Sequence, residues 1–527
     1  MSATEFGDDS GALARKWGKL VGPLLFAAIL LWPDLGLDQL QRRAAAVTAL
    51  VATLWLTQAI PLGAASLIPV ALLSLLGVLN AREAAAVYMD DLVLLFLGAF
   101  IVALGLERWG VHKRMALFLV AHIGTRPRRL VLGFVAATAF VSMWINNTAA
   151  TLMMFPIGVA VIATVSGEEV AQRKRTTPFA AALLIGIAYG ASIGGMATPV
   201  GTAPNQVFLG QMHTLFPQAP QVGFAKWIIG WLPIAVVFVV GAWLILTRIA
   251  LRVEDGDTLA SDAIAEQRAQ LGPMQRGEKM MAFVFGLTAL LWVTREDMNL
   301  DQLTIPGWAG AFAHLQAFGV AGKTAAEFTR HASDATVAVA MAVVCFALPV
   351  DRKRGVYLLD WETAAKMPWD VLLLFGGGFC LAKGFQASGL DRWFGAVLAP
   401  ALVDRPAWQV VCIVVTVMTI ATEFTSNVAI TTLTLPVLAQ TAVASGLDPL
   451  LLMAPATIAA SSGFALPVAT PPNTIVFGSR LVPMGSMLRA GLALDALGIV
   501  LITAGFHFWV RSIWPIASSL PEWAAKH

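Results

Sequence analysis

The amino-acid sequence predicts an all-α polytopic membrane protein with about eleven transmembrane helices and two re-entrant hairpins arranged as inverted repeats. Three observations support this fold class: the composition, two apolar blocks with polar interruptions, and an internal repeat. Hydrophobic residues make up 58% of the 527 residues and charged residues only 13%, whereas soluble domains carry about 25% charged residues. Because a soluble fold needs a polar surface, lipid must replace water around much of this chain.

Hydropathy places the expected spans, and clusters of Lys and Arg orient them with the N-terminus inside. The segment 1–19 is expected to form a short cytoplasmic tail, because no small-residue cleavage site follows the first apolar run. The charged loop 251–279 is expected inside and the loop 295–334 outside, and 516–527 forms a C-terminal tail outside. The spans are expected at about 20–35, 44–61, 63–80, 92–109, 178–196, 226–250, 280–294, 335–350, 370–387, 449–465 and 487–514.

Two further apolar blocks, 130–165 and 407–445, are interrupted by polar residues near their centres. The first block lies between two basic clusters, one ending at Arg129 and one at 173–175. If both clusters are inside, the block enters and leaves the membrane on the same side. We therefore expect re-entrant hairpins, because non-helical tips survive at membrane depth only where protein or a water-filled cavity covers them. The polar tips are Asn146, Asn147 and Thr148 in the first block and Ser426 and Asn427 in the second.

The first half, 20–250, and the second half, 280–515, share three motifs in the same order. Five expected spans separate the two hairpins, and because five is odd, the second copy is expected to be upside down. Inverted repeats are typical of secondary transporters, which bind their substrate near the midplane where the copies meet. The pairs are DDLVLLFLGAF (90–100) with WDVLLLFGGGF (369–379), WINNTAATLMMFPI (144–157) with FTSNVAITTLTLPV (424–437), and IGGMATPVGTAPNQVFLG (193–210) with SGFALPVATPPNTIVFG (462–478).

The polar groups at the tips and breaks can bind both an anion and a cation. Asn147 and Asn427 each offer two amide donors and one carbonyl acceptor. The breaks at Thr198–Asn205 and Ala469–Asn473 contain Gly or Pro where a span would otherwise run straight. Proline frees backbone carbonyls, which suit Na⁺, and exposed helix N-termini suit anions.

No cationic side chain is available in either hairpin. Lys, Arg and His do not occur from 130 to 172 or from 409 to 479. Helix ends supply roughly 0.3–2 kcal/mol each toward binding a negative charge. A Na⁺ about 5 Å from a carboxylate supplies roughly 3 kcal/mol at an effective dielectric near 20. Bound sodium is therefore expected to be the main counter-charge for an anionic substrate, so that the two are transported together.

Other functions fit the sequence less well. The three cysteines lie in apolar stretches without metal-ligand spacing, and no organic cofactor motif is present. An intramembrane enzyme would need a nucleophile–base pair or metal ligands, and the hairpins contain neither. The net charge of +3 gives no indication of a nucleic-acid partner. An anion channel would be separated from a carrier by flux saturation and counterflow. Glu423 is either a proton carrier or, as we favour, a carboxylate satisfied by nearby backbone or hydroxyl donors.

On its paired tip motifs and the breaks that follow them, the chain resembles the divalent anion/sodium symporter family over about residues 20–515. This resemblance implies sodium-coupled symport of di- or tricarboxylates such as succinate, malate and fumarate. It also implies a homodimer in the inner cell membrane, with scaffold and transport domains and elevator-type movement. Two alternatives with the same fold stay open: a sodium-independent exchanger of dicarboxylates and 2-oxoglutarate, and a carrier of sulfate-type divalent anions.

The resemblance also implies site residues. Asn146 stands where the family usually has Ser, and Val428 stands where many members have Thr, which removes a hydroxyl. The expected sodium ligands are Ser142, Asn146, Asn147 and Gly201 at a first site, and Thr422, Thr425, Asn427 and Ala469 at a second. The expected substrate-binding residues are Asn147, Thr148, Thr202, Ser426, Asn427, Val428, Thr470 and Pro471.

Overall fold

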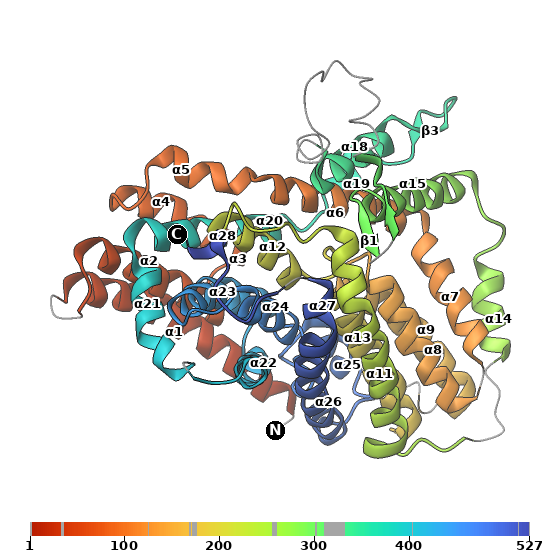
Figure 1. Ribbon diagram of the computed structural model, residues 1–527. Coiled ribbons are helices and arrows are strands. Elements are labelled where there is room, and N and C mark those ends of the chain that lie inside the picture. The colour runs from red at the N-terminus through yellow and green to blue at the C-terminus, as the bar shows by residue number, and fades with distance from the viewer. Residues whose placement is uncertain are drawn as a thin grey trace.

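Helices dominate the fold (Figure 1). In the part of the chain that is described, strands occur as two short antiparallel pairs, β1 (Met298–Leu300) with β2 (Leu303–Ile305) and β3 (Pro349–Asp351) with β4 (Val356–Tyr357). The expected helical membrane fold class is confirmed, while the number of spans and the elevator movement stay predictions. The computed structural model describes residues 3–32, 36–124, 126–167, 170, 176–255, 261–300, 303–309, 332–402, 404–514 and 516–525.

The first half departs from the expected spans at two places. The expected tail is helical from Ala3 onward. The expected span 63–80 is divided into two short helices. Pro69 lies in the first turn of the second helix, where the backbone N–H that proline lacks has no partner within the helix. The helices are α1 (Ala3–Leu31), α2 (Gln39–Thr57), α3 (Leu62–Ala65), α4 (Ile68–Leu75), α5 (Ala81–Ala86), η1 (Val87–Met89), α6 (Asp91–Trp109), α7 (Val111–Ile123), α8 (Pro127–Ser142), α9 (Asn147–Ser166), α11 (Pro178–Met196), α12 (Ala203–Leu215), α13 (Phe224–Leu244) and η2 (Ile245–Ala250).

The second half begins after the charged loop 251–279, which contains a short helix. Most of the loop 295–334 and the basic cluster 173–175 lie outside the described residues. The division into tails, halves and loop stays a prediction. The helices are α14 (Ser261–Gln270), α15 (Arg276–Val293), α18 (Asp334–Ala347), α19 (Trp361–Ala364), α20 (Trp369–Ser388), α21 (Leu390–Leu398), η3 (Ala399–Ala401), α22 (Ala407–Phe424), α23 (Asn427–Ala444), α24 (Leu450–Ala459), α25 (Pro471–Gly478), α26 (Met484–Gly505), η4 (Phe506–Val510), α27 (Arg511–Ile513) and α28 (Glu522–Ala525).

The two halves repeat one series of helices. Each contains a long helix, a short helix, a helical hairpin, a broken pair and a second long helix, from α6 to α13 and from α20 to α26. The first long helix of each series ends at a glycine, Gly110 or Gly389, with φ 70° and ψ 13°. Pro156 and Pro436 lie inside the second helix of each hairpin. Both α13 and α26 continue into a π-helical turn.

The two copies contact each other reciprocally. The short helix after the first break, α12, packs against α23 of the second hairpin, and α25 packs against α9 of the first. Likewise α11 packs against α25, and α24 packs against α12. Reciprocal contacts of this kind are what a two-fold axis produces. The inversion of the copies relative to a membrane stays a prediction.

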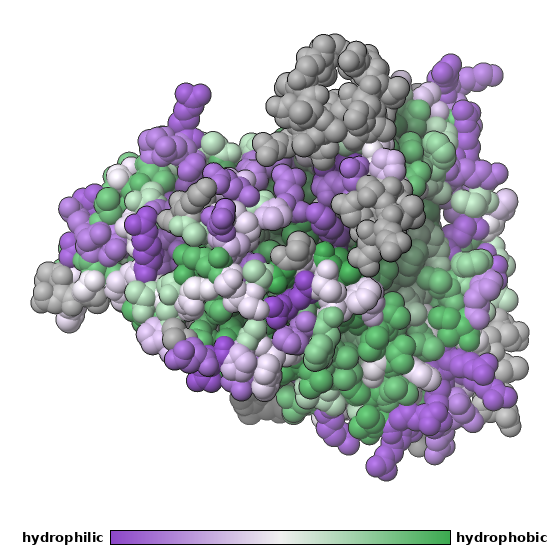
Figure 2. Space-filling view, viewed as in Figure 1, coloured by the Kyte–Doolittle hydropathy of each residue, from purple (hydrophilic) through white to green (hydrophobic). Residues whose placement is uncertain are grey.

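The molecule has an apolar interior, and part of its surface is apolar as well. Every residue of α11 from Phe179 to Met196 is buried, as expected for a helix that is apolar on all sides. Large apolar side chains are nevertheless exposed elsewhere, for example Phe508 at 78% and Phe283 at 70%. Figure 2 shows apolar residues gathered over α13 and its neighbours, with hydrophilic residues below them. Eight helices of the described residues are long and apolar enough to cross a membrane.

Candidate functional site

The first hairpin tip is capped by Asn146. The backbone N–H of Ala149 donates to Asn146 Oδ1 at 2.8 Å, which makes Asn146 the N-cap of α9. Asn147 takes the first helical position, and its amide points back toward α8, where Ser142 Oγ lies 2.8 Å away. The cap therefore fixes where α9 begins and how Asn147 is presented.

The Asn147 amide faces three oxygen atoms. With its nitrogen turned toward them, it donates to Ser142 Oγ at 2.8 Å, to Ala191 O at 3.2 Å and to Gly201 O at 3.3 Å. A half-turn of the amide presents Oδ1 instead, and four oxygen atoms then converge on one place. Carbonyls of unwound backbone together with polar side-chain oxygens are the ligands that transporters use for Na⁺.

A second oxygen cluster lies at the tip of the second hairpin. Thr422 Oγ1 is 2.7 Å from both Asn427 Oδ1 and Ala460 O. A hydroxyl carries one proton, so it can donate to only one of these oxygens, and its other contact brings two lone pairs together. A cation at this place would relieve that repulsion. Ser426 is the N-cap of α23, but its side chain forms no cap bond.

An asparagine holds each break with the same pair of bonds. Asn205 Nδ2 donates to Gly195 O at 3.0 Å and to Thr198 O at 2.8 Å. Asn473 Nδ2 donates to Gly463 O at 3.2 Å and to Leu466 O at 3.0 Å. Both asparagines are fully buried. Because their targets stand ten and seven residues earlier in both copies, the two breaks follow the same local path.

Glycine is required where the first break meets the first tip. A Cβ added to Gly195 would lie 2.5 Å from Asn147 Oδ1 and 3.2 Å from Gly201 O. Gly463, the equivalent position, lies against Thr422 and Ala469, and a Cβ there would meet Ala469 Cβ at 3.1 Å. The close approach of the break backbone to the tip therefore depends on the missing side chain.

The hairpins are fastened to the breaks by different groups. In the first half, Thr198 Oγ1 donates to Met143 O at 2.5 Å. In the second half, the position equivalent to Met143 is Glu423, whose carboxylate accepts from the backbone N–H groups of Ala465 and Leu466, each at 2.8 Å. The favoured interpretation of Glu423, a carboxylate satisfied by backbone donors, is confirmed.

Besides the fully buried Ser192 and Ser461, three hydroxyls at the tips and the first break have no hydrogen-bond partner among the described residues. They belong to Thr148, Thr202 and Ser426. Thr148 and Ser426 are half-buried, and Thr202 is 8% exposed. Each can donate to an anion. Together with the N-termini of α9, α12, α23 and α25, they supply polar groups without a cationic side chain.

Most of the expected site residues are brought together. The structure joins Ser142, Asn147 and Gly201 at the first cluster and Thr422 and Asn427 at the second, with Ala469 close by through Gly463. Two expected sodium ligands lie differently. Asn146 Oδ1 is used by the α9 cap, and Thr425 Oγ1 donates to Ala421 O at 2.9 Å within its own segment.

The remaining expected substrate residues stand at the starts of α23 and α25. Val428 is half-buried, and Pro471 is exposed. Thr470 Oγ1 accepts from the backbone N–H of Asn473 at 3.3 Å, so this hydroxyl still has its own proton to donate.

Three participants were missed by the sequence interpretation: Ala191, Ala460 and Gly195. Ala191 and Ala460 contribute backbone carbonyls to the clusters, and Gly195 leaves room for the first tip and accepts a hydrogen bond from Asn205. Every residue type carries a backbone carbonyl, so no sequence signal could have identified Ala191 or Ala460. Gly195 does stand in the motif that pairs it with Gly463, and this pairing could have found it.

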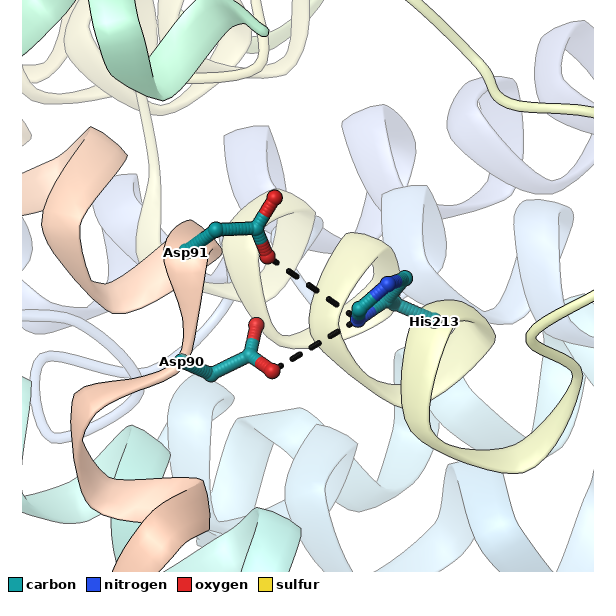
Figure 3. Close-up of side chains that lie close together, drawn as sticks. All are labelled: Asp90, Asp91 and His213. Carbon is teal, nitrogen blue, oxygen red and sulfur yellow. Dashed lines mark ion pairs between the residues drawn. The ribbon is translucent and has the colours of Figure 1, made fainter. Parts of the chain in front are cut away.

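A charged cluster away from the tips joins α6 to α12 (Figure 3). His213 Nδ1 lies 3.5 Å from Asp90 Oδ2 and 3.9 Å from Asp91 Oδ1. Asp90 also caps α6, because its Oδ1 accepts from the backbone N–H of Leu92 at 3.2 Å. The cluster therefore ties the helix after the first break to the start of the long helix α6.

A helical membrane fold with two helical hairpins, two broken helix pairs and two oxygen clusters defines a membrane transport protein. The family model described as the sodium:sulfate symporter transmembrane region matches residues 14–514. This chain belongs to that family.

Similar proteins agree with this assignment. The sodium-dependent dicarboxylate transporter SdcS of Staphylococcus saprophyticus is 38% identical, over 96% of this chain and 93% of the relative. The Na(+)/citrate cotransporter of Rattus norvegicus is 37% identical, over 95% of this chain and 96% of the relative. Both relatives are transporters, so the expectation that this chain is not an enzyme is confirmed.

A solved structure supports the fold alone. The crystal structure of the Alcanivorax borkumensis YdaH transporter, described as having an unusual topology, matches with a TM-score of 0.51. The match covers 84% of this chain and 88% of the other, at 15% sequence identity.

Proposed function

We propose that this protein is a secondary active symporter that couples Na⁺ to the transport of di- or tricarboxylates of the succinate, malate or fumarate type. The observation that carries the proposal is the pair of oxygen clusters at the tips, formed without any cationic side chain in either hairpin. The names of the relatives, which include dicarboxylate and citrate carriers, support the same substrate class.

Sodium would be a transported substrate of the protein and not a resident cofactor. At the first cluster, Ser142, Asn147 and the carbonyls of Ala191 and Gly201 would surround the ion. At the second, Thr422, Asn427 and the carbonyl of Ala460 would do so. At the second cluster, oxygen atoms already face each other at short distance, so a bound ion would replace repulsion with attraction. At the first cluster, the Asn147 amide would turn its oxygen toward the ion.

The carboxylate substrate would lie against the free hydroxyls and helix ends beside the ions. Thr148, Thr202 and Ser426 can donate to its oxygens, and the helix N-termini add partial positive charge. A Na⁺ about 5 Å away adds roughly 3 kcal/mol at an effective dielectric near 20. Since this exceeds what one helix end supplies, the anion and the ion would bind together.

Uptake by reconstituted vesicles tests the proposal. Labelled succinate, citrate and sulfate are offered with a gradient of Na⁺ or, as a control, of choline. We expect succinate uptake at least tenfold faster with Na⁺, and slower uptake of sulfate, because sulfate presents only one charged group. Sulfate uptake faster than succinate uptake would instead support the sulfate-type carrier.

A second candidate is a sodium-independent exchanger of dicarboxylates. The observation that favours it is Asn146, whose amide oxygen is used by the helix cap and leaves the first cluster with one side-chain ligand fewer than expected. Vesicles loaded with succinate and diluted into choline test this candidate. Rapid counterflow of labelled succinate without Na⁺ would support the exchanger.

The assembly and movement are also proposals. We infer a homodimer in the inner cell membrane with the N-terminus in the cytoplasm. The reciprocal packing of α12 on α23 and α25 on α9 supports movement of the two tips and breaks as one body. Single-cysteine labelling from each side of the membrane tests the orientation, and positions 113 and 310 are expected to react from opposite sides.

A further inference from the structure

A cleft of about 540 Å³ lies where α11 and α26 begin and the π-helical turn η2 ends. None of its lining residues belongs to the tips or the breaks. It brings together three segments that the transport site does not use. Its lining residues are Thr176, Thr177, Pro178, Ala181, Ile249, Ala250, Leu251, Arg252, Pro483, Ser486 and Arg489.

Two arginines supply the charge of this cleft. Arg252 forms no ion pair or hydrogen bond within the described residues, and Arg489 donates only from Nε to Gly485 O at 3.1 Å. No acidic side chain lines the cleft among the residues that the structure describes. Guanidinium groups left without a carboxylate partner favour an external anion, and their planar donors suit phosphate oxygens.

An unpartnered serine hydroxyl points to a ligand independently of the arginines. Ser486 is only 9% exposed, and its hydroxyl has no hydrogen-bond partner among the described residues although it lines the cleft. The side chain is largely buried, while its hydroxyl stays accessible from the cleft. A ligand oxygen in the cleft would provide the missing partner.

The backbone adds further donors. The helices α11 and α26 have 19 and 22 residues, and their first turns both open at the cleft. First-turn N–H groups lack partners within the helix, and the helix N-terminus carries partial positive charge. Thr177 caps α11 by accepting from the N–H of Ala180 at 3.2 Å, so its own proton remains free to donate.

We infer that this cleft binds a phosphate-type anion between Arg252, Arg489, Ser486 and the starts of α11 and α26. The headgroup of an anionic lipid is one source of this chemistry, and free phosphate is the other. Ile249 favours the lipid, because its side chain lies at the cleft and is 65% exposed, where an acyl chain can cover it. Basic pockets between transmembrane helices bind anionic headgroups in this way.

Native mass spectrometry of the full-length protein tests the inference. The protein is mixed with phosphatidylglycerol or phosphatidylcholine in detergent, and retained lipid is counted. We expect phosphatidylglycerol to be retained at least fivefold over phosphatidylcholine, and the double variant Arg252→Gln/Arg489→Gln to lose that excess. The control is Lys353→Gln/Arg354→Gln, which removes the same two positive charges outside the cleft, one of them from a side chain that is 84% exposed.

A second arm separates the two sources. The thermal midpoint is measured while inorganic phosphate is added without lipid, because a ligand that binds the folded state raises it. A saturable rise that the double variant lacks assigns the site to free phosphate, whereas protection by phosphatidylglycerol alone assigns it to lipid.

Three results would overturn the inference: protection by neither probe, equal phosphatidylglycerol retention by the double variant, or equal loss in the control Lys353→Gln/Arg354→Gln. If the double variant does not fold, Ser486→Ala decides, because it changes one hydroxyl and keeps both arginines. We expect it to weaken retention two- to threefold, and unchanged retention would count against the site.

Discussion

The two halves of the molecule build the same hairpin and break but fasten them with different groups. In the first half, the neutral hydroxyl of Thr198 donates to the carbonyl of Met143. In the second half, the Glu423 carboxylate accepts from the N–H groups of Ala465 and Leu466. Two hydrogen bonds in the second half stand where the first half has one. The repeat therefore preserves the backbone path while the strength of the fastening differs.

The N-cap residues of α9 and α23 also differ between the two halves. Asn146 uses its side chain to cap α9, whereas Ser426 leaves its hydroxyl free at the start of α23. The side chain at the first tip stabilises a helix, and the corresponding side chain at the second tip remains available to a ligand. We therefore expect the second cluster to contribute more to sodium dependence than the first.

The largest expected effect tests what the halves share. Asn147→Asp and Asn427→Asp should each reduce succinate uptake about 100-fold, because a fixed carboxylate about 5 Å from the substrate costs roughly 3 kcal/mol at an effective dielectric near 20. Uptake by vesicles and elution as a folded protein are both measured. The control Asn80→Asp keeps the cap of α5, which Asp forms equally well, and should transport normally. Substantial uptake by either tip variant would mean that these asparagines only cap helices.

The next effect tests the difference in fastening. Glu423→Gln leaves one of two backbone N–H groups without an acceptor and weakens the other bond, so it should destabilise the protein by about 2–4 kcal/mol. Thr198→Val removes one neutral bond and should cost about 1 kcal/mol. Thermal unfolding in detergent compares the two variants. Equal losses of stability in the two variants would show that the two halves are fastened with equal strength.

The asparagines at the two breaks should contribute equally to the stability of the protein. Asn205→Ala and Asn473→Ala each remove two backbone bonds and should each cost about 2 kcal/mol. Their effects should agree within about 0.5 kcal/mol, because both amides bond the carbonyls ten and seven residues earlier. A loss confined to one variant would show that the breaks are not equivalent.

The smallest expected effects concern the two clusters. Thr422→Ala should raise the Na⁺ concentration for half-maximal uptake about tenfold, which corresponds to about 1.4 kcal/mol. Asn146→Ala should raise it only two- to threefold, since that amide serves the helix cap. Asn146→Ser should behave like the natural protein, because Ser caps helices as well as Asn does. A larger effect at Asn146 than at Thr422 would reverse the ranking of the sites.

Much of the helical framework could be predicted from hydropathy alone. The expected span 178–196 coincides with α11, and 370–387 lies within α20. The prediction was too long at 449–465, because α24 ends at Ala459. An apolar run continues there, but its backbone turns away to meet the second tip, and hydropathy does not distinguish an apolar helix from an apolar break.

The site was predicted in part, for a physical reason. Polar side chains at membrane depth are costly, so Asn147, Thr422 and Asn427 stood out in the sequence. The bonds from Ala465 and Leu466 to Glu423 join residues more than forty positions apart. Their donors are backbone groups that every residue type except proline carries. Only the folded path reveals such contacts.

Calorimetry on the purified protein tests the central claim of sodium–carboxylate coupling most directly. Succinate is titrated in Na⁺ and in choline, and Na⁺ is titrated with and without succinate. We predict that succinate binds at least tenfold more weakly in choline, and that succinate tightens Na⁺ binding by the same factor, because linkage is reciprocal. Equal succinate affinity in the two buffers would contradict the account.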